Sequence, residues 1–300
     1  MILDKLATIV TEDRIKLNEP MKGYTSFNIG GCADRFVLVE NETELAGVLK
    51  VLKESNEPFF LLGNGSNILV SDKGFRGTVI KLCKDFLDIK VENDTITAGA
   101  GVSLSMLAKA AMNNSLSGLE FASGIPGTVG GALFMNAGAY GGEMKQVVTK
   151  VWALDSEADT IVLNNEEMDF GYRHSVLKDK GFIATRCTVK LVHGDGELIR
   201  AQIHELAVKR KEKQPLEYPS AGSTFKRPEG YFAGKLIEDS GLGGYTVGGA
   251  QVSEKHKGFV INRNDASASD VRKLIEDVIE TVKEKQGVVL EPEVIFLGDF

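Results

Sequence analysis

The sequence predicts an α+β fold. Expected strands and helices are mixed along the 300 residues without the steady strand–helix–strand alternation of a doubly wound parallel sheet. A glycine-rich stretch, Phe121–Gly142, lies mid-chain and holds seven glycines, and a long helix with a regular apolar stripe lies near the C-terminus. This length suffices for two or three domains with substantial cores.

Composition narrows the class of protein. The hydrophobic fraction of 43% and the charged fraction of 26% are typical of a soluble globular protein. A net charge of −7 argues against a nucleic-acid partner. The one basic cluster, residues 209–213, ends an expected helix, where cations suit the helix dipole. No apolar run approaches the length of a membrane span, and the N-terminus lacks the pattern of a signal peptide.

The cysteines indicate a reducing compartment. Cys32, Cys83 and Cys187 are odd in number and widely spaced, which excludes a disulfide framework and a CxxC zinc site. We therefore expect a cytoplasmic protein without a metal site or membrane segment.

Residues 1–84 predict a first group of helices and strands. A helix that begins near Thr43 has a single apolar face, made of Leu45, Val48, Leu49 and Leu52. A short helix and an approach segment are expected in residues 1–30. Strands are expected at 35–39, 59–62, 68–72 and 78–82.

Residues 85–200 predict two hairpins and a helix. One hairpin joins 88–92 to 95–101 through Asn93-Asp94, and the other joins 147–155 to 160–164. Ser103 is a suitable N-cap for a helix at 104–114. A turn of helix and a loop are expected at 165–175, and a strand at 181–192.

The last third begins within an expected helix at 197–213, whose inward residues are Ile199, Ile203 and Leu206. A later helix carries the clearest stripe in the chain, with Ser267 and Asp270 as a capping box and Gly287 as its stop. The stripe consists of Val271, Leu274, Ile275, Val278, Ile279 and Val282. The remaining expectations are a loop at 217–230, a short helix at 233–241 and strands at 245–249, 258–263 and 288–298.

Three glycine-containing loops indicate a ligand that carries phosphate. Glycine is favoured where the backbone needs positive φ or a close approach to a ligand. The loop 63–67 (GNGSN) and the turn 123–127 (SGIPG) could present successive N–H groups to a pyrophosphate, although a glycine-rich loop packed under a sheet is the ordinary alternative. The segment 99–104 starts like a dinucleotide fingerprint, but Leu104 replaces its third glycine.

Six motifs in order make the chain similar to a known family. They are LGNGSNILVSD, SGIPGTVGGALFMNAGAYGG, FGYRHS, AGSTFKRP, AGKLIEDSGLGG and LEPEV. The set resembles the UDP-N-acetylenolpyruvoylglucosamine reductases, the MurB flavoenzymes of peptidoglycan synthesis, from about residue 20 to the end. The resemblance implies an FAD-binding fold of the vanillyl-alcohol-oxidase (PCMH) type in two subdomains, expected at 1–84 and 85–200. It also implies a substrate-binding domain at 201–300.

The resemblance further implies noncovalent FAD, with NADPH as hydride donor. NADPH would alternate in one cleft with the substrate, UDP-N-acetylglucosamine enolpyruvate, which would become UDP-N-acetylmuramate. The expected cofactor-binding residues are Gly63, Asn64, Gly65, Ser66, Asn67, Gly99, Gly101, Ser123, Gly124, Ile125, Pro126, Gly127, Gly130, Asn136, Gly138 and Ala139.

Family position assigns catalysis to Arg173, Ser223 and Glu293. Hydride would pass from NADPH to flavin N5 and then to enolpyruvyl C3, while charge builds on the substrate carboxylate. A fixed guanidinium at Arg173 suits that charge, a protonated or donor-assisted Glu293 would help polarise the carboxylate, and Ser223 would protonate C2. Expected substrate contacts are Tyr172, Lys226, Arg227 and Lys235.

Spacing alone would not select these residues. Without the resemblance, Arg173 is an ordinary surface residue and Ser223 a turn residue. A strand period of two puts Glu291 and Glu293 on one face without choosing between them.

The chain departs from the family pattern at two points. Arg227 stands where many members have Asn, and it could meet the UDP diphosphate; an Arg227→Ala variant with unchanged substrate KM would contradict that. The short interval between Arg173 and Ser223 indicates the shorter branch, which lacks the insertion with a lid tyrosine.

Two other functions fit part of the pattern. Another FAD oxidoreductase, acting on a small alcohol or hydroxy acid, would need a base, and some such enzymes attach flavin through His or Cys. The four histidines, His174, His193, His204 and His256, lack an attachment context. A noncatalytic nucleotide-binding regulator would leave the Arg, Ser and Glu motifs without a role.

Overall fold

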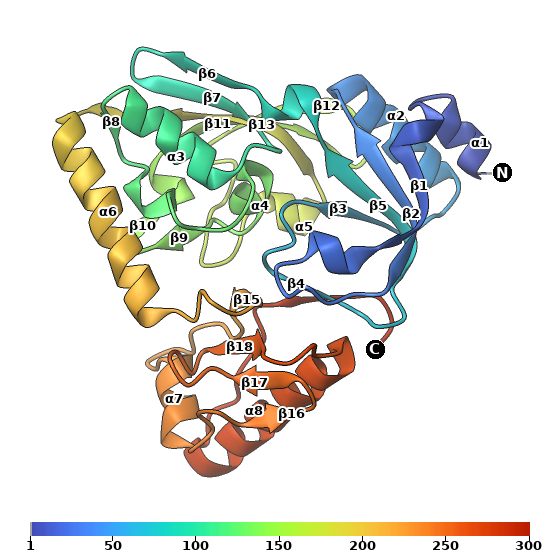
Figure 1. Ribbon diagram of the computed structural model, residues 1–300. Coiled ribbons are helices and arrows are strands. Elements are labelled where there is room, and N and C mark those ends of the chain that lie inside the picture. Colours follow the sequence, from blue (N-terminus) through green and yellow to red (C-terminus); the bar gives the residue numbers. More distant parts are fainter. Residues whose placement is uncertain (1) are drawn as a thin grey trace. The chain divides into compact units, whose positions relative to one another are not determined.

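The computed structural model describes residues 2–300 and has the α+β architecture expected (Figure 1). Its Cα atoms group into two compact units. Of the described residues, the first unit comprises 2–16, 36–63 and 78–209, and the second comprises 17–35, 64–77 and 210–300. The division at 1–84, 85–200 and 201–300 stays a prediction.

A five-stranded antiparallel sheet dominates the first unit, in the order β12-β11-β13-β7-β6. Both predicted hairpins are confirmed, and Asn93 turns the first of them with a φ of 53°. The strands are β6 (Ile89–Glu92), β7 (Thr95–Gly99), β11 (Val148–Leu154), β12 (Thr160–Asn164) and β13 (Ile183–Lys190).

A second sheet has the order β1-β2-β5-β3. Its strands are β1 (Ile15–Pro20), β2 (Cys32–Val39), β5 (Phe75–Leu82) and β3 (Phe59–Leu62), and β3 pairs with β5 in parallel. Strand β1 falls in the expected approach segment and was not predicted, because its polar sequence lacks a strand pattern. All four predicted core residues of α2 (Glu42–Glu54) are buried.

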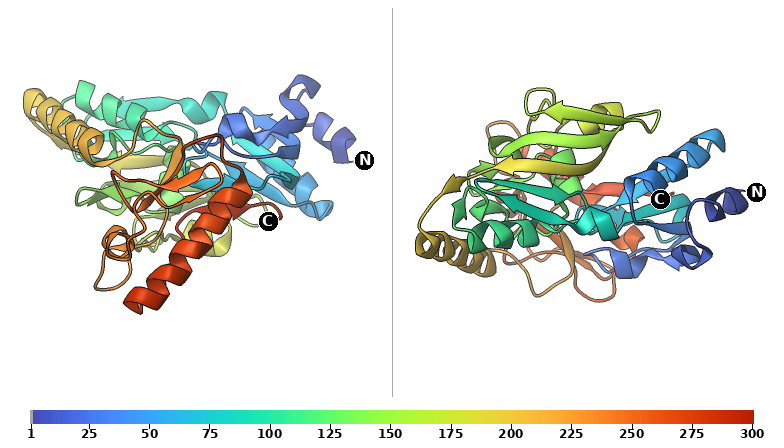
Figure 2. Two further views of the ribbon diagram at one scale, coloured as in Figure 1. Left: turned by 60° about the horizontal axis from the view of Figure 1, so that its bottom comes forward. Right: turned by 90° about the horizontal axis from the view of Figure 1, so that it is seen from above.

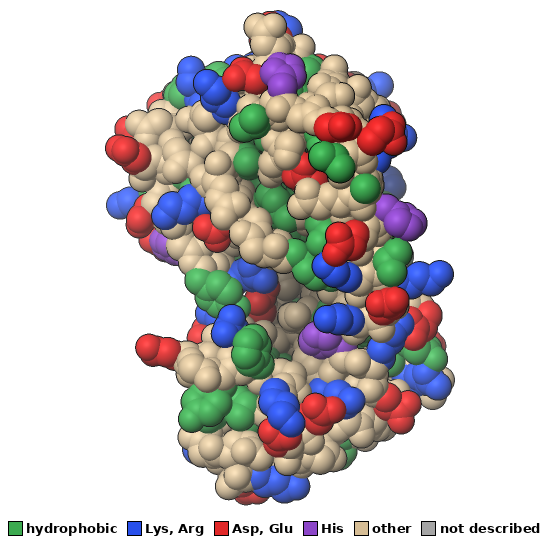
Figure 3. All heavy atoms as spheres, turned by 90° about the vertical axis from the view of Figure 1, so that its left-hand side faces the viewer, with side chains coloured by type: hydrophobic (Ala, Val, Ile, Leu, Met, Phe, Trp, Pro, Cys, Tyr) green, Lys and Arg blue, Asp and Glu red, His purple; other side chains and the backbone are tan. Residues whose placement is uncertain are grey.

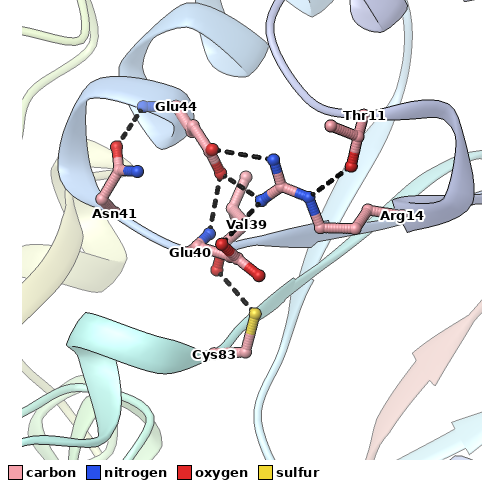
Figure 4. A network of polar contacts seen from close by, with 7 residues as sticks. All are labelled: Thr11, Arg14, Val39, Glu40, Asn41, Glu44 and Cys83. Carbon is pink, nitrogen blue, oxygen red and sulfur yellow. Dashed lines mark hydrogen bonds and ion pairs between the residues drawn. The ribbon is translucent and has the colours of Figure 1, made fainter.

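An ion-pair network lies at the start of the first unit (Figure 4). The Arg14 guanidinium donates to both carboxylate oxygens of Glu44, at 2.6 and 2.8 Å, and its Nε donates to Thr11 Oγ1. Glu44 also accepts the Glu40 N–H, and its pKa is lowered chiefly by the hydrogen bond from Arg14. The pair joins the residues before β1 to the first turn of α2.

The remaining elements of the first unit are short, apart from α6. They are α1 (Ile2–Ala7), α3 (Leu104–Asn113), α4 (Val129–Phe134), α5 (Val176–Lys180), α6 (Gly196–Lys213), β8 (Leu116–Ser117), β9 (Gly138–Ala139), β10 (Gly142–Glu143) and β14 (Val192–His193). The 3₁₀ turns of the chain are Glu12–Arg14, Met21–Tyr24, Lys84–Leu87, Glu120–Ala122 and Met144–Gln146. Ser103 caps α3 as predicted, by accepting the Met106 N–H.

The second unit contains a four-stranded sheet of order β15-β18-β17-β16 and the helix α7 (Ala233–Asp239). The strands are β15 (Ser220–Ser223), β16 (Thr246–Val247), β17 (Ala250–Val252) and β18 (Phe259–Asn262). The expected loop at 217–230 is therefore wrong over β15, and the strand expected at 245–249 covers only β16. Strand β17 was not predicted.

The strand expected at 288–298 is confirmed only over β19 (Ile295–Leu297), which pairs in parallel with β4 (Ile68–Val70). Residues 288–294 form only an isolated bridge between Phe225 and Pro292. Proline has no N–H to donate to a ladder, which explains why the regular strand starts after Pro292.

Helix α8 (Ala268–Gln286) confirms the clearest sequence prediction and is the long red helix of Figure 2. Ser267 and Asp270 form the expected capping box, and Gly287 ends the helix with a φ of 70°. A residue distant in sequence adds a second cap. The Asp72 carboxylate accepts the N–H groups of Ala268 and Ser269, at 2.8 and 2.9 Å, and the Ser269 hydroxyl at 2.7 Å.

Candidate active site

Parts of three glycine-containing segments predicted to bind a cofactor, at Gly63, residues 99–104 and residues 128–130, meet inside the first unit. A Cβ atom on Gly63 would lie 2.8 Å from Thr128 Oγ1, too close to fit without movement. Thr128 bridges to Ser103, and the Gly130 N–H donates to the Ala100 carbonyl oxygen at 2.8 Å. The end of β3, the turn before α3 and the start of α4 thus form one backbone surface.

The loop at residues 63–67 has a backbone that fits an anion. Among residues 2–300, no acceptor receives the N–H groups of Asn64, Gly65 or Ser66. Gly65 has a φ of 60°, and a Cβ there would clash with the Tyr24 carbonyl oxygen. Successive N–H groups next to a residue of positive φ form a concave nest for phosphate oxygens, so the loop fits the diphosphate of FAD.

The turn at residues 123–127 also exposes part of its backbone to solvent. Gly124 and Pro126 are exposed, and within the described chain no acceptor receives the Gly124 or Gly127 N–H. Thr128 fixes the next residues, because its hydroxyl oxygen accepts the Gly131 N–H and caps α4. The turn can therefore offer two amide donors from a fixed position.

Asn136 connects the glycine-rich stretch to the Arg173 turn. Its side chain is buried, its Nδ2 donates to the Gly171 carbonyl oxygen at 3.0 Å and to Glu143, and its Oδ1 accepts the Lys145 N–H at 2.9 Å. Both amide N–H groups are used within the chain. A cofactor contact at Asn136 would therefore come from its backbone, while its side chain positions the turn that bears Arg173.

Arg173 occupies a tight turn in the first unit. Gly171 and His174 exchange backbone hydrogen bonds of 3.1 and 3.3 Å around Tyr172 and Arg173, and Arg173 has a φ of 54°. The guanidinium carbon lies 5.2 Å from the centroid of the exposed Tyr172 ring. A closed turn and a stacked ring restrict the directions that this guanidinium can take.

Ser223 and Glu293 are brought to paired segments of the second unit. Ser223 ends β15 opposite Phe259. The Glu293 N–H donates to the carbonyl oxygen of Thr224, the next residue, at 2.8 Å. The two expected catalytic residues thus lie on adjoining backbone, although 70 positions apart in sequence (293 − 223).

Asn67, from the predicted phosphate loop, fixes the backbone on either side of Glu293. Its side-chain Nδ2 donates to the Glu293 carbonyl oxygen at 3.1 Å, and its own carbonyl oxygen accepts the Ile295 N–H at 3.0 Å. Within the second unit, the end of the loop 63–67 therefore positions one expected catalytic residue.

The expected substrate contacts differ in how they are held. Lys226 Nζ forms an ion pair with Glu291. The Glu291 carboxylate is therefore engaged with a lysine of the same chain. The Arg227 guanidinium carbon stacks 4.0 Å from the centroid of the exposed Phe232 ring. Lys235 pairs with Asp239 on the exposed face of α7, at 2.5 Å.

Three findings concern metal ions, membranes and charged ligands. In the described part of the chain, His, Cys, Asp and Glu side chains nowhere gather in threes that could hold a metal ion, and no helix is long and apolar enough to cross a bilayer. Basic and acidic side chains are interspersed over the face drawn in Figure 3.

Comparison with known proteins decides the family. The MurB C-terminal domain model, described as that of UDP-N-acetylenolpyruvoylglucosamine reductase, matches residues 214–297, and an FAD binding domain model matches residues 33–164. The reductase of Caldanaerobacter subterraneus is 53% identical over 299 residues, covering 100% of this chain and 99% of the relative. The chain belongs to the UDP-N-acetylenolpyruvoylglucosamine reductase family.

Other members of the reductase family agree along the whole chain. The reductase of Clostridioides difficile is 50% identical over 98% of this chain and 97% of its own length. The crystal structure of MurB from Thermus caldophilus has a TM-score of 0.81 and 37% identity, covering 94% of this chain and 98% of that one. A glucose dehydrogenase, Phl p 4.0202, at 14% identity and a TM-score of 0.50 over 65% of this chain and 44% of that chain, shares the FAD-binding fold. The expected PCMH-type fold with a MurB C-terminal domain is confirmed.

Sequence reasoning named Asn136 and Asn67 as cofactor-binding residues but did not predict that their side chains position other segments. Asn136 was expected to touch the cofactor, but its side chain holds a carbonyl 35 positions away, and Asn67 holds one 226 positions away. Such contacts depend on tertiary structure and leave no local pattern. Only the placement of asparagine within glycine-rich loops pointed to either residue.

Proposed function

We propose that this chain reduces UDP-N-acetylglucosamine enolpyruvate to UDP-N-acetylmuramate in peptidoglycan precursor synthesis, with NADPH as the reductant. The observation that carries the proposal is the match to named reductases over the full chain. NADPH and the substrate would use one cleft in turn. The free thiols of Cys32, Cys83 and Cys187 suit the reducing cytoplasm in which we place the enzyme.

The chemistry that bound FAD supplies is transfer of a hydride from NADPH to enolpyruvyl C3. Its diphosphate would be held by the backbone of the loop 63–67 and the turn 123–127. The available donors are the N–H groups of residues 64–66, Gly124 and Gly127, which have no acceptor among residues 2–300. Further contacts are proposed at Gly99, Gly101, Gly130, Asn136, Gly138 and Ala139.

Ser223 is the proposed proton donor to C2. Addition of hydride at C3 leaves negative charge shared between C2 and the substrate carboxylate, and the hydroxyl proton of Ser223 completes the saturated lactyl group. The strand ladder between β15 and β18 fixes the Ser223 backbone, which favours transfer from a constant direction.

Arg173 and Glu293 are proposed to stabilise the charge on the carboxylate. Arg173 does so as a permanent cation held by its turn, and Glu293 does so as a protonated acid or through a donor partner. Tyr172, Lys226, Arg227 and Lys235 are the proposed contacts to the rest of the substrate. For Arg227, the stacked guanidinium suits a diphosphate.

The test is to run the reaction in deuterated water and analyse the product. We expect UDP-N-acetylmuramate that carries solvent deuterium at C2, formed only when NADPH is present. A C2 hydrogen that does not come from solvent would contradict proton delivery at that carbon, and the absence of product would reject the reaction.

A further inference from the structure

Lys81 lies on β5 directly beside the predicted phosphate loop, and the catalytic scheme gives it no role. In the parallel pairing of β3 with β5, Lys81 stands opposite Leu62, the residue before Gly63. Its Nζ donates to the Gly63 carbonyl oxygen at 2.8 Å. The lysine therefore holds the peptide group at which the loop begins.

The Lys81 ammonium is partly buried without an acidic partner. Among residues 2–300, no Asp or Glu side chain pairs with Lys81, and burial lowers its pKa. Removing a cation from water without a compensating anion costs free energy. A neutral donor would satisfy the Gly63 carbonyl equally well, so the positive charge needs a separate explanation.

The geometry of the peptide bond supplies that explanation. The Gly63–Asn64 bond is trans, as are all described peptide bonds, so the Asn64 N–H points away from the Gly63 carbonyl oxygen. A cation at the oxygen polarises the peptide group and makes its N–H a stronger donor. The Asn64 N–H is one of those without an acceptor among the described residues.

We propose that Lys81 is a positioning residue for the FAD diphosphate, acting through the Gly63–Asn64 peptide group and as a nearby countercharge. This role rests on the proposed function, because it requires bound FAD. Bound diphosphate would supply the anion that the buried ammonium lacks. The lysine therefore costs stability in the cofactor-free chain and strengthens binding of the cofactor.

The test compares three variants of the full chain after FAD has been removed by dialysis. Lys81→Met removes the charge and keeps the length of the side chain, Lys81→Arg keeps the charge, and Lys90→Met removes a lysine whose side chain is 72% exposed on β6. FAD affinity is measured by quenching of flavin fluorescence, and stability without FAD by the urea midpoint.

We expect Lys81→Met to weaken FAD binding by about tenfold or more, with an unchanged or higher urea midpoint without FAD. The FAD affinity of Lys81→Arg should stay within about threefold of wild type, and Lys90→Met should bind FAD as tightly as wild type does. A lower urea midpoint together with weaker binding would indicate a merely structural hydrogen bond and overturn the role. Unchanged FAD affinity in Lys81→Met would also overturn it. A wild-type chain that takes up no FAD would overturn the proposed cofactor and, with it, this role.

Discussion

Ser223 shows how a single residue acquires a fixed direction in this protein. It ends a strand, and its neighbour Thr224 bonds through its backbone to both Gly258 and Glu293. Its hydroxyl can therefore be removed without removing any of these backbone hydrogen bonds. A Ser223 variant can therefore test the proton-transfer step separately from reduction of the cofactor.

We expect Ser223→Ala to keep NADPH-dependent flavin reduction within about twofold and to lose about 10²–10⁴ in kcat, the usual contribution of a general acid. Stopped-flow absorbance measures the first step and product formation the second. Ser220→Ala, on the same strand, is the matched control and should keep both. Full turnover by Ser223→Ala would remove Ser223 from catalysis.

At the scale of single residues, the sequence pointed to the expected catalytic residues through their position in family motifs and not through their physical environment. Arg173, Ser223 and Glu293 were singled out by motif, whereas the fixing of Glu293 by Asn67 and of the Arg173 turn by Asn136 needed the tertiary structure. Assignment of Arg173, Ser223 and Glu293 to catalysis stays a prediction until variants are measured.

Helix α8 depends on a residue far outside its own sequence. The capping box of Ser267 and Asp270 was predictable, but the Asp72 carboxylate, which accepts three hydrogen bonds at the same helix end, was not. Asp72 follows β4 by two residues, so it ties the start of α8 to the segment after the phosphate loop within the second unit.

We expect Asp72→Ala to lower the free energy of unfolding by about 1–2 kcal/mol, because it removes a carboxylate that satisfies two helix N–H groups. Urea denaturation of the full chain measures this. Asp265→Ala is the control, since the side chain of Asp265 is 85% exposed and pairs with Lys22 at the surface.

The stability that Asp72→Ala loses should depend on pH. Burial raises the pKa of Asp72, but the hydrogen bonds from Ser269 and Ala268 outweigh it and hold the pKa below its ordinary value. The stabilisation is therefore complete above the unfolded pKa of about 4 and disappears as pH falls through the folded value. Wild type and Asp72→Ala should converge in stability at low pH, and a constant difference would contradict this account.

Local patterns predicted the elements whose signals are local. The stripe of α8, the cap of α3 and both hairpins follow from residues a few positions apart. Strand β15 was missed, because a short strand with few apolar residues resembles a loop. Strands β4 and β19 were expected, but their parallel pairing was not, because the two partners lie far apart in sequence.

At the scale of the whole molecule, the chain passes repeatedly between its two units. Residues 17–35 and 64–77 belong with the C-terminal residues, so a division into consecutive segments cannot describe the compact units. The predicted phosphate loop at 63–67 illustrates the consequence. Gly63 ends a segment of the first unit, and Asn64–Asn67 begin a segment of the second. The sequence pattern gave no sign of this interleaving, and the division into three consecutive parts at 1–84, 85–200 and 201–300 stays a prediction.

The loop 63–67 serves two parts of the proposed chemistry. Its N–H groups at residues 64–66 are the donors that we propose for the FAD diphosphate, and its Asn67 fixes the backbone of Glu293. Loss of the loop would therefore weaken cofactor binding and displace an expected catalytic residue together.

The central claim is tested most directly by following NADPH absorbance with the FAD-loaded chain, with and without UDP-N-acetylglucosamine enolpyruvate. We expect slow oxidation alone and a rapid, substrate-dependent loss of one NADPH for each UDP-N-acetylmuramate formed. NADPH oxidation that does not change when the substrate is added would contradict the proposed reductase function.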